Sequence, residues 1–211
     1  MAITFPLDLP STSFRSMKVM PFTPVSETTS IFSSAIQVQK YEGEMWVYDI
    51  TLPVMDENTA EDWVSFFLKL NGMYGTFLFQ DPKRSTPRGS AKDTAGSPKF
   101  DGAHSVRDTE IDIKDAPTST TGYLKAGDLI QFGTSGSARM HKVLDDVDTD
   151  GSGDAAGVNI WPPLRSAYSD GDAIIVSNAK CVFRMMDNNL DYDIDEAQLY
   201  QKTFRIREAL P

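Results

Sequence analysis

The fold is decided by one stretch between residues 63 and 72, which reads Trp63-Val64-Ser65-Phe66-Phe67-Leu68-Lys69-Leu70-Asn71-Gly72. Four of its large apolar side chains share the spacing i, i+3, i+4 and i+7: Trp63, Phe66, Phe67 and Leu70. That spacing places them along one face of an α-helix. Burial of such a stripe contributes on the order of 1.5–3 kcal/mol per large side chain. The stretch therefore predicts a helix that packs against a sheet.

The neighbouring residues predict where this helix begins and ends. Asn58 and Thr59 are good N-cap residues, and Glu61 or Asp62 would complete a capping box. Gly72 is a natural C-terminal stop, because glycine adopts the left-handed conformation without strain.

Strands are predicted on both sides of the helix. Before it, three segments alternate apolar and polar residues: 16–25, 33–39 and 44–52. After it, residues 73–80 form an aromatic strand that ends at Asp81-Pro82.

The middle of the chain has a different composition. Residues 83–99 are rich in Ser, Thr, Pro, Gly and charged residues, which predicts an exposed loop or linker. Short strands separated by turn signals follow at 109–113, 124–132, 139–144, 158–161 and 173–176. Strands of this length and spacing are typical of a small barrel or sandwich.

The end of the chain returns to longer strand patterns, at 182–186 and 200–207. Between them, residues 187–196 are acidic and rich in Asn, so we expect a loop there. The run 200–207 then lacks a nearby partner, and we expect it to pair with the strand at 44–52.

These segments together predict a mainly β protein with one short α-helix. Residues 1–85 and 181–211 would form one β-sandwich-like domain, and residues 86–180 would be inserted into it as a small β-barrel domain.

Composition excludes several classes of function. The chain has 211 residues and a net charge of −10, which argues against a basic groove for nucleic acid and against binding to an anionic membrane. No apolar run approaches the ~20 residues of a membrane helix. The first six residues lack a basic start followed by an apolar core, so we expect no signal peptide and folding in a cytoplasm.

Catalytic chemistry is not indicated, and we expect neither an enzyme nor a cofactor. The only histidines are His104 and His141, for which packing roles are expected, and no nucleophile, phosphate-loop or dinucleotide motif is present. Cys181 is the single cysteine, so no intramolecular disulfide can form. Its apolar neighbours predict a buried small hydrophobe.

One motif resembles the first half of a calcium-binding loop: Asp146, Asp148 and Asp150, followed by Gly151. The twelfth position, however, is Gly157 rather than a bidentate Glu, and the flanking segments predict strands. We therefore favour a flexible acidic hairpin loop and keep calcium as a weak alternative.

Three aromatic residues offer a second alternative, contact with a sugar: Tyr123, Trp161 and Tyr168. If exposed, they would suit a carbohydrate-binding module or adhesin. A glycan hydrolase is a weaker hypothesis, because no spacing singles out a pair among the 30 Asp and Glu residues.

Two parts of the chain resemble the distal tail proteins of long-tailed bacteriophages (siphophages) and related gene transfer agents. The first is the helix stretch at 63–72, followed by Gly75-Thr76-Phe77-Leu78-Phe79-Gln80-Asp81-Pro82. It resembles that group because there a short helix ends in a glycine and an aromatic strand ends at an Asp-Pro pair. The second is Ala126-Gly127-Asp128-Leu129-Ile130-Gln131-Phe132, with Ile160-Trp161-Pro162-Pro163-Leu164-Arg165 and Gly171-Asp172-Ala173 after it. It is similar to the small β domain that these proteins carry as an insertion. The signature residues are Trp63, Phe66, Phe67, Leu70, Phe77 and Phe79.

The resemblance implies a structural virion protein without a catalytic motif. Both chain ends would form a belt domain that assembles into a hexameric ring at the tail tip, after synthesis in the bacterial cytoplasm. The implied partners are further copies of the chain, the tail tube protein, the hub or baseplate protein and the tape measure protein. DNA would be passing cargo only, and no membrane is involved. Another tail-tube or hub protein of related fold remains an alternative.

Overall fold

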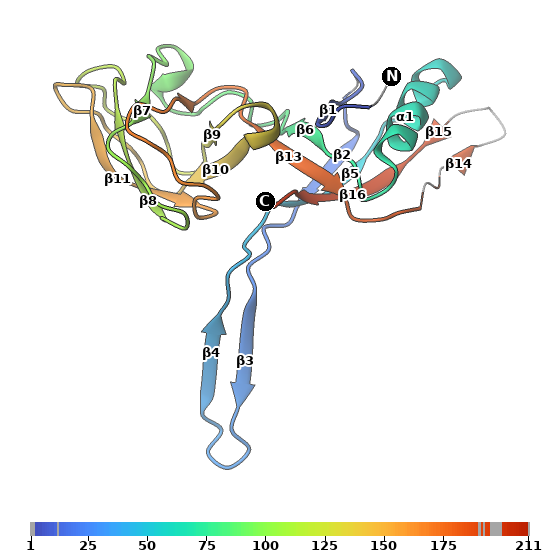
Figure 1. Ribbon diagram of the computed structural model, residues 1–211, viewed down its shortest axis with the longest axis horizontal. Helices are drawn as coiled ribbons and strands as arrows, with labels where there is room; N and C mark the ends of the chain where they lie inside the picture. The colour runs from blue at the N-terminus through green and yellow to red at the C-terminus, as the bar shows by residue number, and fades with distance from the viewer. Residues whose placement is uncertain (1–2, 12, 190, 192, 195–199, 211) are drawn as a thin grey trace. The chain divides into compact units, whose positions relative to one another are not determined.

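The computed structural model describes residues 3–11, 13–189, 191, 193–194 and 200–210, and the fold is mainly β with one α-helix. One six-stranded sheet has the order β1 (Leu7–Asp8), β6 (Phe77–Gln80), β13 (Lys180–Met185), β16 (Thr203–Glu208), β5 (Val47–Thr51), β2 (Ser16–Val19). The other has the order β12 (Ile174–Ile175), β9 (Leu129–Phe132), β10 (Arg139–Val143), β11 (Ala155–Trp161), β8 (Glu110–Lys114), β7 (Lys99–Phe100). Two hairpins, β3 (Val25–Thr29) with β4 (Ile36–Lys40) and β14 (Asp193–Ile194) with β15 (Tyr200–Gln201), complete the strands (Figure 1).

The helix α1 (Glu57–Leu70) begins two to three residues earlier than expected. Its N-cap is Asp56, not Asn58 or Thr59, and the Asp56 carboxylate accepts a hydrogen bond from the Thr59 amide at 3.2 Å. The hydrogen bonds from Thr59 hold the pKa of Asp56 below its usual value. At the other end Asn71 adopts the left-handed conformation at φ 51°, and Gly72 follows at φ 65°.

The predicted apolar stripe of α1 is confirmed, because all four of its residues are buried. Trp63 and Phe67 lie against Phe204 of β16, with ring centroids 5.8 Å and 5.1 Å apart. The stripe therefore covers one face of the sheet formed by β16, β5 and β2.

The predicted pairing of the chain's last strand is also confirmed. Strand β16 runs antiparallel to β5, with Phe204 opposite Ile50. On the same pair of strands, the Arg205 guanidinium donates to both carboxylate oxygens of Asp49, at 2.5 Å and 3.1 Å. The Arg205 hydrogen bond lowers the pKa of Asp49. Thus the chain ends share a sheet.

The chain divides into two compact units. The first unit contains residues 1–9, 76–183 and 209–211, and the second contains residues 10–75 and 184–208. Strands β1, β6 and β13 belong to the first unit, so these limits differ from the predicted insertion at 86–180. The predicted limits stay a prediction.

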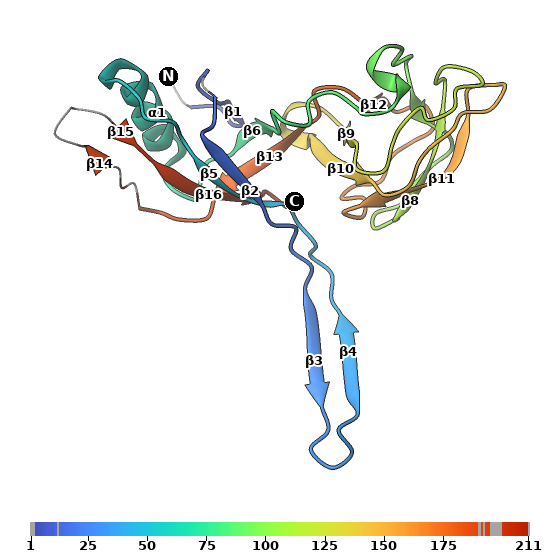
Figure 2. The same cartoon turned by 180° about the vertical axis from the view of Figure 1, so that it is seen from behind.

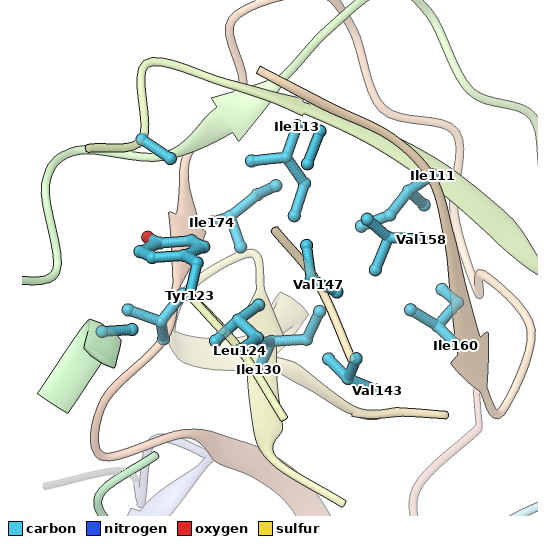
Figure 3. Close-up of a cluster of buried hydrophobic side chains, with 14 of the residues drawn as sticks. Ile111, Ile113, Tyr123, Leu124, Ile130, Val143, Val147, Val158, Ile160 and Ile174 are labelled. Carbon is cyan, nitrogen blue, oxygen red and sulfur yellow. The ribbon is translucent and has the colours of Figure 1, made fainter. Parts of the chain in front are cut away.

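Within the first unit, the sheet from β12 to β7 closes on itself. Ile174 of β12 donates its amide to Pro98, and Phe100 of β7 donates its amide to Asp172, both at 2.9 Å. Buried side chains fill the interior of this barrel, as Figure 3 shows for Ile111, Ile130 and Val158. Every member of this core cluster lies between Ala91 and Val176. Such filling is expected for a small barrel.

The expectation of an exposed linker at 83–99 is wrong in part. The buried carboxylate of Asp128 accepts the amides of Arg88 (2.7 Å), Gly89 (3.2 Å) and Lys125 (2.8 Å). This places Ala91, in the short 3₁₀-helix Ser90–Lys92, inside the barrel core. Gly89 lies so close that an added Cβ would approach the Tyr123 carbonyl oxygen to 2.2 Å. Asp128, which lies 40 residues from Arg88 in sequence, thus attaches the segment around Arg88 to the barrel through hydrogen bonds.

Other differences concern strand lengths. The predicted strand at 16–25 is split into β2 and the start of β3, because Pro21 and Pro24 lack the amides that a ladder requires. The predicted loop at 187–196 includes the short strand β14. Residues 190, 192, 195 and 196 of this predicted loop lie outside the described part of the chain. Residues 1 and 2, which belong to the signal-peptide prediction, lie outside it as well.

The barrel core predicts that residues 86–180 fold without the rest of the chain. We expect the excised segment to unfold cooperatively in thermal circular dichroism, because all members of its core cluster come from within it. We expect the remaining halves, joined by a short Gly-Ser linker, to stay soluble and folded. An excised segment that is unfolded, together with joined halves that aggregate, would mean that the chain has one continuous core.

Candidate functional site

The most unusual feature of the second unit is a long hairpin that no described residue outside it covers. We call it the arm and define it as residues 22–45, which comprise β3, β4, their turn and the paired stem. At the stem Phe22 and Met45 exchange two backbone hydrogen bonds, at 2.9 Å and 3.0 Å. In Figures 1 and 2 the arm extends away from β2 and β5.

The register of the arm separates its side chains into two faces. Val25 lies opposite Lys40, Glu27 opposite Val38, and Thr29 opposite Ile36. Because side chains alternate along a strand, these residues share one face, and the other face carries only uncharged polar residues. We call the first the apolar face, after Val25, Ile36 and Val38. The members of the polar face are Ser26, Thr28, Gln37 and Gln39.

The apolar face is open to solvent. Val25, Ile36 and Val38 are 52%, 63% and 61% exposed. From Pro21 to Glu42 every residue except Pro24 and Ser30 is exposed. A two-stranded hairpin is only marginally stable by itself in water, and its unpaired edges and apolar side chains favour association. The arm therefore presents an apolar face that none of the described residues buries.

The turn at the end of the arm, residues 30–35, presents the two most exposed large apolar side chains of the described chain. Ile31 is 89% exposed and Phe32 is 95% exposed. The Ser30 hydroxyl accepts the amides of Phe32 and Ser33 at 3.4 Å, and the Ser33 hydroxyl accepts the Ala35 amide at 3.4 Å. Ser30 and Ser34 donate their amides to carbonyl oxygens within the turn, at 2.9 Å each. The turn satisfies most of its own backbone donors.

The signature residues of the sequence analysis are structural. Trp63, Phe66, Phe67 and Leu70 form the buried face of α1, and Phe77 and Phe79 are fully buried in β6. Phe79 packs edge-on against Phe183 of β13, at 5.2 Å. They are core residues of the two units.

The three aromatic residues considered for sugar contact do not form one exposed surface. Tyr123 is fully buried, and its hydroxyl donates to the Ala95 carbonyl at 2.6 Å. Burial raises the pKa of Tyr123 to about 12. Tyr168 is partly buried and stacks on Phe100 at 4.8 Å, and Trp161 is partly exposed in β11. The expectation that Tyr123 is exposed is therefore wrong.

The three aspartates of the calcium-like loop point to different parts of the barrel. Asp146 accepts from the Lys125 ammonium at 2.8 Å, Asp148 from the Gly122 amide at 2.6 Å, and Asp150 from the Ser152 and Asp154 amides at 2.8 Å and 2.9 Å. These hydrogen bonds lower the pKa values of Asp146 and Asp150. No group of three metal-ligating side chains occurs among the described residues.

Both histidines and the cysteine are packed. The His141 ring is fully buried, donates from Nδ1 to the Pro162 carbonyl at 2.7 Å and stacks on Phe132 at 4.7 Å. His104 accepts the Asp112 amide at Nε2, 3.3 Å away. Cys181 is buried, as predicted. The described residues include no helix with the length and apolar character that a membrane crossing requires.

No family model matches the sequence, and no curated protein matches it. The likeness to distal tail proteins therefore rests on the residues quoted above.

Sequence reasoning missed the arm as a functional element. The alternation of apolar and polar residues in the arm correctly predicted strands. Such alternation alone, however, predicts a half-buried strand within a sheet. The available signal was Ile31-Phe32 placed between serines, in a stretch without charge from residue 28 to residue 39. Two large apolar residues at a polar turn predict an exposed apolar tip, which the structure shows.

Burial of His141 predicts acid sensitivity of the fold. Burial lowers the pKa of His141 from 6.5 to about 3, so below pH 6.5 the unfolded chain takes up a proton that the folded chain does not. Stability is therefore retained above pH 6.5 and lost as the pH falls toward 3. We expect a loss of roughly 2 kcal/mol from this residue between pH 7 and pH 5.

Urea unfolding of the wild type and of His141→Gln, at pH 7 and pH 5, checks this expectation. The variant should lose less stability between the two pH values, since glutamine does not titrate. Carboxylates with lowered pKa values, such as Asp49, weaken both proteins at still lower pH and cancel in the comparison. Equal losses in both proteins would contradict the role of His141.

We also expect calcium to be dispensable. The carboxylates of Asp146, Asp148 and Asp150 already accept hydrogen bonds from the chain and would have to release them to hold a metal ion. Adding a chelator or millimolar calcium should leave the melting temperature unchanged. A calcium-dependent rise that disappears in both Asp148→Ala and Asp150→Ala would establish a metal site, because binding to the folded state raises its stability.

Proposed function

We propose that this chain is a structural virion protein that forms a hexameric ring at the distal end of a long phage tail, where it connects the tail tube to the hub or baseplate. The observation that carries the assembly role is the uncovered arm. The place in a tail and the six-fold symmetry come from the resemblance of the sequence to distal tail proteins.

The arm supports self-assembly for a geometric reason. Each copy of the chain supplies one arm and needs one cover for its apolar face. If the cover is a different surface of the next copy, the contact is head-to-tail, and a rotation that closes leaves no arm uncovered. Among head-to-tail assemblies, only a closed ring leaves no copy with an uncovered arm.

Charge is consistent with a channel for DNA. Six copies that each carry −10 make a strongly negative ring. DNA that passes through such a ring is repelled by it rather than held. DNA thus acts as cargo, and the lasting partners are the tail tube, the hub or baseplate and the tape measure protein.

The sugar-binding alternative has lost support, because Tyr123 is buried and only Tyr168 and Trp161 remain on the barrel. A related tube or hub protein would also form rings. Antibody labelling of intact tails under the electron microscope separates these positions.

We expect the purified chain to form closed rings in negative-stain images and mass photometry, and the apolar face to be required. Val25→Thr combined with Val38→Thr keeps the shape of both side chains and adds a hydroxyl group to each. The resulting loss of apolar burial should weaken association roughly ten- to a hundredfold.

The matched control is Ser26→Thr combined with Gln37→Thr on the polar face, which should leave assembly nearly unchanged. A chain that stays monomeric even with a tail tube partner present would refute the ring. Equal effects of the two double variants would show that the apolar face is not the contact.

A further inference from the structure

Two cationic side chains meet on the outer face of the barrel. Lys142 of β10 points away from the barrel core, because its neighbour Val143 belongs to that core and side chains alternate along a strand. The Arg88 guanidinium donates from Nη1 to the Ala126 carbonyl at 3.1 Å. A β-carbon on Gly127 would lie 3.6 Å from Arg88 Nη1 and 3.7 Å from Lys142 Cε. The two cations therefore flank the same bare α-carbon.

A third cation comes from the turn that follows β6. In this turn the Asp81 carboxylate accepts the Lys83 amide at 2.9 Å, and the Asp81 carbonyl accepts the Arg84 amide at 3.2 Å. Burial, followed by the positive charge of Arg84, lowers the pKa of Lys142, whereas the negative charge of Asp81 raises it. The turn thus brings Arg84 and Asp81 close enough to Lys142 for their charges to act on it.

These three cations are not neutralised within the chain. None of them forms an ion pair with any residue that the structure describes. The nearby carboxylates have other partners, since Asp146 pairs with Lys125 at 2.8 Å and Asp128 accepts backbone amides. Like charges that lie close together repel each other. The cluster is therefore an environment that favours an anion, in a chain whose net charge is −10.

Asp81 adds an acceptor that has no donor. Its side chain is 1% exposed, and its Oδ2 is buried without a hydrogen-bond partner in the described part of the chain. A buried carboxylate oxygen without a donor is unfavourable, and such atoms are rare in folded proteins. A ligand with both negative oxygens and one O–H group would serve the three cations and Asp81 together.

We infer that Arg84, Arg88, Lys142 and Asp81 bind a phosphate group that carries a proton, either as hydrogen phosphate or at the end of a phosphate monoester. The charged phosphate oxygens accept hydrogen bonds from the two guanidinium groups and the ammonium group, and the P–OH group donates to Asp81 Oδ2. Three cations and one carboxylate have a net charge of +2, which suits doubly charged hydrogen phosphate. The site is independent of the proposed ring, because all four residues belong to the first unit and the arm belongs to the second.

The proton of the ligand makes the site selective. Sulfate and simple carboxylates carry no proton at neutral pH, so they offer nothing to Asp81 Oδ2 and bring a further negative charge against it. Phosphate should therefore bind more tightly than sulfate, although the two ions have similar size and shape.

Calorimetric titration of the full chain at pH 7, with phosphate and with sulfate at equal ionic strength, tests this selectivity. We expect phosphate to bind at least roughly tenfold more tightly than sulfate, which corresponds to one hydrogen bond to a charged group. In Asp81→Asn the side-chain oxygen still accepts the Lys83 amide, and the new NH₂ group donates instead of accepting. This variant should lose the preference for phosphate over sulfate while it still binds both ions.

Removal of single cations tests the cluster itself. Arg84→Gln and Lys142→Gln should each weaken phosphate binding roughly ten- to a hundredfold, because each removes one charge-assisted hydrogen bond. The matched control is Lys92→Gln, which removes the same charge from an exposed side chain of the same unit that lies beside Asp93. It should bind phosphate like the wild type. Urea unfolding of all variants shows whether the fold is retained.

The source of the phosphate group follows from a third titration, with methyl phosphate. Binding as tight as that of inorganic phosphate assigns the site to the end of a phosphate monoester, and binding of inorganic phosphate alone assigns it to the free ion; both support the inference. Equal affinity of the wild type for phosphate and sulfate, or equal weakening by Lys92→Gln and Arg84→Gln, would reveal general charge attraction and overturn it. No binding at millimolar phosphate would overturn it as well, and none of these results bears on the ring.

Discussion

The packing of Phe204 against Trp63 and Phe67 is the contact on which the second unit depends. It joins a strand near the end of the chain to a helix about 140 residues earlier. It gives the stripe of α1 an aromatic partner on the sheet, and it adds to the ladder and to the Arg205–Asp49 pair that hold β16 beside β5. Closing so long a connection costs only slightly more than closing a short one, because the entropy of closure grows with the logarithm of length. A few large aromatic contacts suffice to hold the chain ends together while a whole barrel lies between them in sequence.

Most elements of the fold could be predicted from local patterns in the sequence. The stripe of α1 and the alternation at residues 200–207 each repeat with the period of their own element, so both were predicted correctly from a few residues. The N-cap was missed because Asp56 lies outside the apolar stripe, and Asn58 and Thr59 offered equally good chemistry. The segment 83–99 was misjudged because its burial depends on Asp128, and a carboxylate 40 residues away leaves no trace in local composition.

The arm marks a different limit of sequence reasoning. Its alternation specifies a strand with one apolar side, and that is correct for Val25, Ile36 and Val38. What the alternation cannot specify is which molecule covers that side. The same alternation is buried on one side in β5 and exposed along the whole of β4, where no described residue covers the apolar side. The candidates for sugar and calcium binding lost support for the opposite reason: the Tyr123 hydroxyl and the Asp148 carboxylate already have hydrogen-bond partners within the barrel.

Strands β6 and β13 pair antiparallel, with Gln80 opposite Lys180. The chain therefore leaves for the barrel and returns from it at neighbouring positions, separated by one strand spacing of about 5 Å. Any other domain whose own ends lie that close fits the same two positions without altering the ladder. The ladder between β6 and β13 therefore fixes only where the intervening segment leaves and returns, and sets no limit on its length.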